Sequence, residues 1–286
     1  MEEKKKYILI LSCKDTMGIV AAVSGFLAEK GCFILESAQT GDASTGNFFM
    51  RTVFEIQKGQ EKHSELKQKF AKIADKFSMQ WGIYDAAEKT RTLIMVSKQG
   101  HCLNDLLHRY SSGSLPIDIV GVISNHTDME RMVQWYDIPF HYLPVNEQTR
   151  TQQENKILEI IEENRVDLTV LARYMQVITP NLVKNIYGKS INIHHSFLPG
   201  FKGAKPYHQA YDRGVKIIGA TAHYVSNDLD EGPIIEQEVT RVNHNHTPEQ
   251  LLAIGRDIES MVLSRAVQYF IERRVILNGG KTVVFG

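Results

Sequence analysis

The residues best suited to chemistry gather toward the carboxyl end, where six of the eleven histidines lie between His194 and His246. Asn192 and His194 stand two positions apart in an apolar run that predicts a strand, so their side chains share one face. An amide beside an imidazole at the carboxyl end of a strand suits the polarisation of a carbonyl and the transfer of protons. Further along, the segment 226–233 (SNDLDEGP) carries three carboxylates in a tight loop, and one of them could fold back against His194.

Each of these pieces also has a purely structural interpretation. The amide and the imidazole could form hydrogen bonds with the backbone of a loop, and the acidic loop could simply be exposed to solvent. His223, inside a predicted strand, could be a hydrogen-bonded interior residue. His244 and His246 have the spacing of metal ligands and leave a zinc hydrolase as a chemical alternative. Because the sequence has no recognisable ligand motif such as His-Glu-x-x-His, we expect no metal.

The elements that must position these residues alternate along the second part of the chain. Five short apolar runs separated by helical patterns are expected as strands, at 92–97, 117–124, 140–145, 168–172 and 191–195. Strands that alternate with helices predict a Rossmann-like α/β fold, with a mostly parallel sheet covered on both faces. Such a sheet binds ligands at the carboxyl ends of its strands.

Short residue patterns between 179 and 285 predict further helices and strands. Thr179 and Pro180 predict the start of a helix, with the threonine as its cap. Two more strands, 220–226 and 234–242, are close enough in sequence to pair antiparallel. A capping box at 247–250 begins a long helix that runs to about residue 273, and 282–285 is expected as an edge strand.

The first part of the chain has a different plan. Four apolar runs and two helical patterns follow one another in the order strand, helix, strand, strand, helix, strand. This is the ferredoxin-like βαββαβ plan, in which two helices cover one face of an antiparallel sheet. The polar segment 86–91 is the expected linker between a first domain at 1–85 and a second domain at 92–286.

Composition argues against several classes of protein. Lys and Arg number 33 and so do Asp and Glu, so the chain lacks the basic excess of a typical nucleic-acid binder. No apolar run approaches the roughly 18 residues of a membrane span, and the first residues carry no apolar signal segment. Cys13, Cys32 and Cys102 are far apart, which argues against a disulfide framework, and we expect a cytoplasmic protein. Neither the Gly-x-Gly-x-x-Gly motif nor a Gly-Lys-Ser/Thr phosphate loop occurs, which disfavours the common nucleotide-dependent enzymes.

The first strand-to-helix turn, Asp15-x-x-Gly18-Ile19-Val20-Ala21, together with the βαββαβ order, resembles the ACT domain. ACT domains usually bind small amino acids where two copies pair, and they regulate an attached enzyme. The resemblance implies an effector site at Asp15, Gly18 and Ile19, with glycine or methionine as the effector, and a homodimer or homotetramer. A Gly18 turn that exposes amides at a helix amino terminus suits a carboxylate, although a turn that only connects two elements is the alternative.

The motifs from about residue 91 onward resemble the folate-dependent formyltransferase family in their order and spacing. They are Asn-Ile-His-x-Ser-x-Leu-Pro at 192–199, Lys202-Gly203, His208-Gln209-Ala210, the run 219–225 and the run 229–235. The resemblance implies that Asn192, His194 and Asp230 are catalytic and that 10-formyltetrahydrofolate is the substrate, with no cofactor. It also implies that His223 and one further segment bind the substrate, and this segment has Gln176 where the family often has Arg. Its residues are Arg173, Tyr174, Met175, Gln176, Val177 and Ile178.

The loop after the first strand of the second domain bears on which acceptor takes the formyl group. In the transferases of purine synthesis, a glycine-rich loop at this place holds the acceptor's phosphate on backbone amides. Here the loop 98–102 reads KQGHC, with one glycine and bulkier neighbours, so it offers less of the close backbone approach that such a cradle needs. We therefore expect water as the acceptor and formate as the product, in purine and one-carbon metabolism. Transfer to a small amine, or an inactive folate and amino-acid sensor, remain the alternatives.

Overall fold

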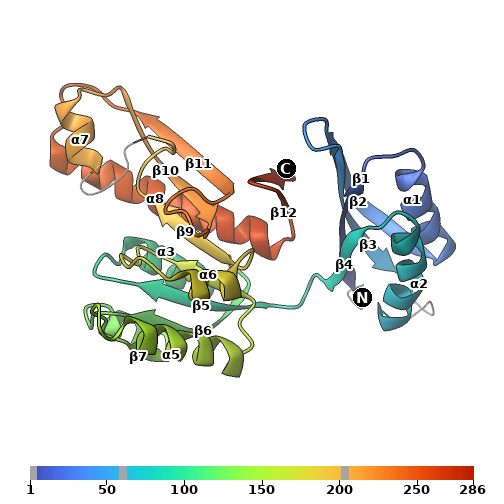
Figure 1. Ribbon diagram of the computed structural model, residues 1–286, viewed down its shortest axis with the longest axis horizontal. Coiled ribbons are helices and arrows are strands. Elements are labelled where there is room, and N and C mark those ends of the chain that lie inside the picture. The colour runs from blue at the N-terminus through green and yellow to red at the C-terminus, as the bar shows by residue number, and fades with distance from the viewer. Residues whose placement is uncertain (1–4, 58–62, 201–205) are drawn as a thin grey trace. The chain divides into compact units, whose positions relative to one another are not determined.

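The computed structural model describes residues 5–57, 63–200 and 206–286, and the chain divides into two compact units (Figure 1). The first unit contains Met1–Glu88 together with Glu272–Asn278 and Val283–Gly286, and the second contains Lys89–Ile271 and Gly279–Thr282. The chain therefore leaves the first unit after Glu88 and returns to it at Glu272. None of the described helices combines the length and the apolar character needed to cross a bilayer. The Lys202-Gly203 motif lies outside the described residues.

The first unit has the βαββαβ order that the sequence predicts. Its elements are β1 (Lys6–Lys14), α1 (Ile19–Glu29), β2 (Cys32–Asp42), β3 (Asn47–Ile56), α2 (His63–Lys76) and β4 (Gln80–Asp85). The sheet order is β2-β3-β1-β4 with every neighbouring pair antiparallel, and both helices lie on one side of it (Figure 1). Because side chains alternate along a strand, Leu9 and Leu11 of β1 face the helices and join Val23 and Phe70 in one core.

The other face of this sheet meets the returning carboxyl-terminal segments. The Arg51 Nε donates to the carbonyl oxygen of Glu272 at 3.1 Å, and the side chain of Asn278 is linked to Asp42 at 2.5 Å and to Asn47 at 3.3 Å. Arg51 is buried although it faces away from the helices. The last residues of the chain therefore complete the first unit.

The second unit is built on a seven-stranded sheet of order β11-β10-β9-β8-β5-β6-β7. Its strands are β5 (Thr90–Val96), β6 (Ile117–Ser124), β7 (Phe140–Tyr142), β8 (Leu168–Leu171), β9 (Ser190–His194), β10 (Ile217–Tyr224) and β11 (Ile234–Arg241). The five strands from β9 to β7 are parallel, and β10 is antiparallel to both β9 and β11. The predicted mostly parallel sheet and the predicted antiparallel pair are confirmed.

Six helices connect and cover these strands. They are α3 (His101–Ser111), α4 (Glu130–Gln134), α5 (Arg150–Glu163), α6 (Pro180–Ile186), α7 (Pro206–Asp212) and α8 (Pro248–Ile271). The predicted capping box of α8 is present, because the backbone N–H of Thr247 donates to Gln250 Oε1 at 2.9 Å and the Gln250 N–H donates to Thr247 Oγ1 at 3.3 Å.

The strand order reverses between β5 and β8. From β5 the chain proceeds through β6 to the β7 edge, and it then returns to place β8 on the other side of β5. Connections leave the carboxyl ends of β5 and β8 in opposite directions, and this divergence creates the crevice in which such sheets bind ligands.

Four expectations about individual elements are wrong in detail. The linker is shorter than 86–91, because β4 ends at Asp85 and β5 begins at Thr90. The segment expected as an edge strand instead forms β13 (Lys281–Val284), which pairs with β12 (Val275–Asn278) in a separate two-stranded sheet. Residues 272–278 and 283–286 group with the first unit, so the second domain does not extend to residue 286. Thr179 precedes α6 but makes no capping hydrogen bond, because its hydroxyl donates to Glu154.

Candidate active site

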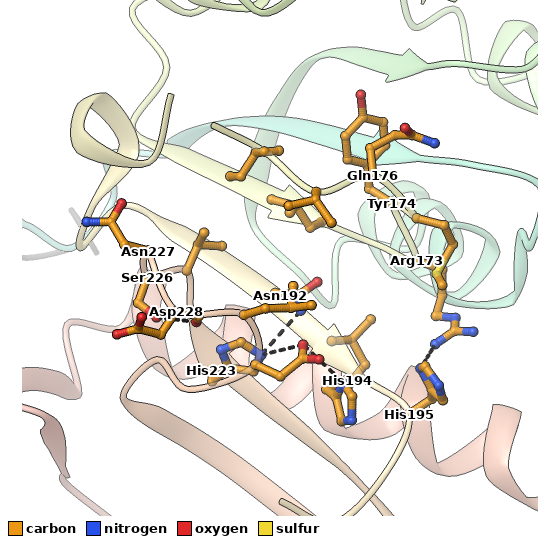
Figure 2. A pocket seen from close by; sticks show the side chains of 18 residues that line it. Arg173, Tyr174, Gln176, Asn192, His194, His195, His223, Ser226, Asn227 and Asp228 are labelled. Atoms are coloured by element: carbon orange, nitrogen blue, oxygen red, sulfur yellow. Dashed lines mark hydrogen bonds and ion pairs between the residues drawn. The ribbon is translucent and has the colours of Figure 1, made fainter. Parts of the chain in front are cut away.

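A cavity of about 300 Å³ lies at the carboxyl ends of β8 and β9 (Figure 2). Three stretches of chain line it: the end of β8 with the segment after it, the end of β9, and the β10–β11 connection. The lining residues include all of the predicted catalytic and substrate-binding residues of the second unit. The sheet therefore brings together side chains that are far apart in sequence.

The pairing of β9 with β10 fixes the first two side chains. Asn192 stands directly opposite His223 in this antiparallel pair, so both project from the same face. The Asn192 amide nitrogen lies 3.2 Å from His223 Nε2, and His223 Nδ1 lies 2.8 Å from the carbonyl oxygen of Tyr224. Because a carbonyl oxygen only accepts, the ring proton of His223 is on Nδ1, and Nε2 accepts from the Asn192 amide. His223 therefore orients Asn192.

Burial keeps His223 neutral. The residue is 2% exposed, and this burial lowers the pKa of His223 below its ordinary value of 6.5, although the backbone carbonyl and Asp230 act in the opposite direction. A neutral ring is what the donation from Asn192 requires, since only an unprotonated nitrogen can accept.

The acidic loop does fold back against His194. Asp230 Oδ1 lies 3.1 Å from His194 Nδ1 and 3.9 Å from His223 Nε2. Asp230 reaches this position with a φ of +59°, a left-handed conformation that Asp tolerates better than most residues. Gly232 allows the loop to pass close to β10, because a Cβ there would lie 1.7 Å from the carbonyl oxygen of Tyr224.

The contact with His194 sets the charge of Asp230. Partial burial acts to raise the pKa of Asp230, but the hydrogen bond and the charge of His194 outweigh it, and the pKa lies below its ordinary value. Asp230 is therefore a carboxylate that accepts the Nδ1 proton of His194.

The other ring nitrogen of His194, Nε2, has no hydrogen-bond partner within the part of the chain that the structure describes. Among the described residues, His194 Nε2 is one of two buried side-chain nitrogen or oxygen atoms that make no hydrogen bond. Buried polar atoms are nearly always paired, and an exception at a cavity marks a position where a ligand or a reacting group can bind.

The segment predicted to bind the substrate divides into two kinds of residue. Met175 and Val177 are each 56% exposed and offer apolar surface at the rim. Tyr174 turns inward, where its hydroxyl accepts from Gln153 Nε2 at 3.0 Å, and burial raises the pKa of Tyr174 to about 12. The backbone N–H of Met175 donates to Ser97 Oγ at 2.9 Å, which fixes the segment to the end of β5.

The predicted effector residues lie in the first unit. Gly18 has a φ of +94° and begins the turn into α1, as its residue type predicts. The Ile19 side chain is 2% exposed and belongs to the core, so any contact of Ile19 with a ligand must use its backbone. The side chain of Asp15 lies beside Gly41, where an added Cβ would meet its Oδ2 at 2.7 Å.

Comparison with known proteins places this geometry in a family. Residues 90–267 match the family model described as formyl transferase. The formyltetrahydrofolate deformylase of Corynebacterium sp. (strain P-1) is 49% identical over 284 residues, which are 99% of each chain. The solved structure of a formyltetrahydrofolate deformylase from Burkholderia mallei is 51% identical, with a TM-score of 0.95 over 99% of this chain and 100% of that one. The chain belongs to the formyl transferase family, among its formyltetrahydrofolate deformylases.

The deformylase family shares the fold of its second unit with enzymes of a different name. A glycinamide ribonucleotide transformylase from Symbiobacterium toebii is 28% identical, with a TM-score of 0.64 over 69% of this chain and 95% of that one. The fold of the second unit is therefore shared, and fold alone does not distinguish the two kinds of enzyme.

Arg173 was predicted as a site residue, but its surroundings, formed by Gln99, Tyr207 and Glu259, were not predicted from the sequence. Arg173 donates to Gln99 Oε1 at 3.0 and 3.1 Å and lies 3.3 Å from Glu259 Oε2, while Glu259 also accepts from Tyr207 at 2.7 Å. Glu259 is 1% exposed within α8. The signal that could have found it is a carboxylate four residues before Leu263, inside the apolar stripe of a helix, because a charge there needs buried partners.

Proposed function

We propose that this protein hydrolyses 10-formyltetrahydrofolate to tetrahydrofolate and formate. One observation carries the proposal: His194 holds a carboxylate on Nδ1, and its buried Nε2, without a partner among the described residues, lies at a cavity that Asn192 also lines. This arrangement suits acyl transfer, in which charge develops on a carbonyl oxygen and a proton must move. Relatives of nearly full length carry the name formyltetrahydrofolate deformylase, which supports the assignment.

In the proposed reaction, Asp230 positions a water molecule and takes its proton. Both imidazole contacts of Asp230 use Oδ1, so Oδ2 can accept from the water. The water oxygen adds to the formyl carbon, and the former carbonyl oxygen becomes an oxyanion. Such acid–base assistance contributes roughly 10²–10⁴-fold to a rate.

Asn192 and His194 stabilise the oxyanion. The Asn192 amide has two N–H donors, and His223 accepts one of them, so the other is available to the substrate. When its ring carries a proton on both nitrogens, His194 donates from Nε2 while Asp230 accepts from Nδ1, and one such donor contributes roughly 10²–10³-fold. The bond between the formyl carbon and the folate nitrogen then breaks, and the proton taken from water is delivered to that nitrogen.

The apolar rim suits the pterin end of the substrate. Met175 and Val177 expose apolar surface beside the cavity, and Gln176 supplies an amide at its lining. The reaction needs no redox group, and we propose that it runs without a cofactor.

The test is a mass-spectrometric product assay of the full chain with 10-formyltetrahydrofolate. We expect one formate for each tetrahydrofolate, with no formylated product when small amines are added. A formylated amine in place of formate would identify a transferase instead. Binding of the folate without any turnover would identify a sensor.

The first unit is proposed to be an ACT-like regulatory module. Its antiparallel βαββαβ sheet and the positive φ of Gly18 support this, since the turn places a helix amino terminus where a carboxylate can bind. We propose glycine or methionine as the effector and pairing of two or four copies through these units. Isothermal titration with each amino acid and light scattering test both points, and they fail if neither amino acid binds and the chain is monomeric.

The proposed location is the cytoplasm. Within the described residues, Cys13, Cys32 and Cys102 form no disulfide, and a reducing compartment keeps thiols in this state.

A further inference from the structure

The crevice at the strand-order reversal between β5 and β8 is filled by the protein's own side chains. Gln99 follows β5, Arg173 follows β8, and the Arg173 guanidinium donates twice to Gln99 Oε1. The same guanidinium contacts His195 Nδ1 at 2.5 Å, and Figure 2 shows these two side chains pointing toward each other beside His194. A sheet of this kind ordinarily places a ligand in this crevice.

A buried carboxylate from α8 holds the arrangement together. Glu259 accepts from His101 Nε2 at 2.8 Å and from the Tyr207 hydroxyl at 2.7 Å, and it lies 3.3 Å from Arg173 Nε. Burial acts to raise the pKa of Glu259, but the hydrogen bond from His101 and the charge of Arg173 outweigh it and lower the pKa. We refer to Gln99, His101, Arg173, His195, Tyr207 and Glu259 as the Arg173 network.

The Arg173 network is poorly suited to bind a metal ion. The ligand atoms of His101, Cys102 and Glu259 lie within 4.8 Å of one another, which is close enough to consider a metal site. However, burial and the neighbouring Glu259 raise the pKa of the Cys102 thiol, and a thiol must lose its proton to bind a metal. The Arg173 guanidinium also contacts the carboxylate that a metal would need.

The backbone of Arg173 indicates that its side chain serves a purpose. Arg173 has a φ of +65°, a left-handed conformation that favours glycine. Non-glycine residues in this conformation gather at functional sites, where the surrounding contacts offset its cost. The Arg173 side chain is 8% exposed and lies between the crevice and the cavity that His194 lines.

We propose that the Arg173 network determines acceptor specificity by occupying the space from which an amine would approach the formyl carbon. The proposal rests on the proposed hydrolysis. The His195 ring, which Arg173 fixes, stacks on the His194 ring with centroids 4.9 Å apart, so the network borders the reacting group directly. Water is small enough to attack through the cavity, whereas an amine with its substituent needs the filled crevice.

Removal of the network would allow transfer to compete with hydrolysis. The amine nitrogen would add to the formyl carbon with its lone pair, the bond from that carbon to the folate nitrogen would break, and the amine proton would pass to the folate nitrogen. The products would be an N-formyl amine and tetrahydrofolate, with no oxidant or reductant involved.

The test variant is Arg173→Gly, which empties the crevice and suits the left-handed backbone. Its matched control is Arg165→Gly, the same substitution at an exposed residue with a φ of +48° at the end of α5. Each variant is incubated with 10-formyltetrahydrofolate and glycinamide, and formate and N-formylglycinamide are measured by mass spectrometry. We expect Arg173→Gly to raise the ratio of formylated amine to formate about tenfold or more over the wild type, and Arg165→Gly to leave it unchanged.

The outcomes separate this proposal from the proposed function. A wild type that releases no formate contradicts the hydrolase assignment. An Arg173→Gly variant that hydrolyses the folate with the wild-type ratio overturns the network proposal alone. Should that variant be inactive or unfolded, Gln99→Ala, which frees Arg173 on one side, is expected to raise the ratio in the same direction. An unchanged ratio in Gln99→Ala, or loss of all turnover in both folded variants, also overturns the proposal.

Discussion

The two ring nitrogens of His194 have opposite surroundings. Nδ1 faces the carboxylate of Asp230 at 3.1 Å, and Nε2 is buried at the cavity without a partner among the described residues. The carboxylate accepts the proton of Nδ1 and so orients the ring, which leaves Nε2 to face the reacting group. At the scale of single residues, the chemistry therefore depends on Asp230 more than on any other neighbour of His194.

Replacement of Asp230 by Asn should abolish most turnover without preventing folate binding. We expect kcat for formate release to fall by about 10²–10⁴-fold, because an amide neither takes a proton from water nor stabilises the charged imidazole. The matched control is Asp228→Asn, a carboxylate of the same loop that also lines the cavity but makes no contact with His194 in the structure. Near-normal turnover in Asp230→Asn would remove this residue from the mechanism.

His223 should make the stability of the second unit depend on pH. Burial holds the pKa of His223 below 6.5, so the unfolded chain binds a proton on this residue at a higher pH than the folded protein does. The stability it contributes is therefore present above about pH 6.5 and is lost as the pH falls through its lowered folded pKa.

The measurement is the melting temperature at about pH 7.5 and pH 5.5. The wild type should melt lower at the acidic pH, and His223→Asn should reduce this drop by on the order of 2–4 °C. His244→Asn, at an exposed position, should behave like the wild type. Equal pH dependence in all three proteins would show that His223 is not held neutral.

Residue types and spacing predicted the central group but not its surroundings. The proximity of Asn192, His194 and one carboxylate of the acidic loop could be predicted from the sequence, because strand alternation and a tight turn are local properties. The roles of Arg173 and Glu259 could not, because their pairing joins a loop after β8 to the middle of α8 and depends on the tertiary packing of both.

At the scale of elements, the β10–β11 connection is the part that delivers Asp230. Gly232 lies two residues after Asp230 and passes β10 so closely that a Cβ would lie 1.7 Å from the Tyr224 carbonyl oxygen and 3.0 Å from His223 Nδ1. Gly232→Ala must therefore displace this connection. We expect activity to fall by about 10²-fold, since a misplacement of about 1 Å has that effect.

Gly232→Ala should also lower the free energy of unfolding by about 1–3 kcal/mol, as overpacking does. The control is Gly25→Ala in α1, where an added Cβ meets nothing within 4 Å. This variant should keep full activity and gain about 0.5–1 kcal/mol from the removal of a helical glycine. Kinetics and urea unfolding of both variants provide the check.

Element order was predictable, and element ends were less so. The alternation of strands with helices can be predicted from the periodicity of apolar residues. The capping box of α8 can be predicted from residue types that lie close together in the sequence. Thr179 shows the limit: its type and the following proline indicate a capped helix, yet the hydroxyl donates to Glu154 of α5, a partner that only the tertiary fold supplies.

At the scale of the whole molecule, the chain crosses between its two units four times, after residues 88, 271, 278 and 282. Asn278 is 3% exposed and bonded to both Asp42 and Asn47, so it ties the last residues to the sheet of the first unit. Asn278→Ala should reduce the stability of the first unit by about 1–3 kcal/mol, because both partners lose a buried hydrogen bond.

The molecule offers a local probe for this measurement. It has two tryptophans, Trp81 in the first unit and Trp135 in the second, so Trp81 fluorescence in a Trp135→Phe background reports on the first unit. Urea unfolding followed in this way should shift for Asn278→Ala and stay unchanged for Asn245→Ala, an exposed asparagine. If the two variants unfold at the same urea concentration, the carboxyl-terminal segments 272–278 and 283–286 do not stabilise the first unit.

The late return of the chain has a consequence for biosynthesis. A ribosome releases residues up to Glu88 first, but the partners of Arg51 and Asn47 are among the last to emerge, after Ile271. One face of the first sheet therefore stays uncovered until residues 272–278 have been made, and a product terminated before them keeps it exposed to chaperones and proteases. Completion of the amino-terminal unit thus requires that the second unit has been translated first.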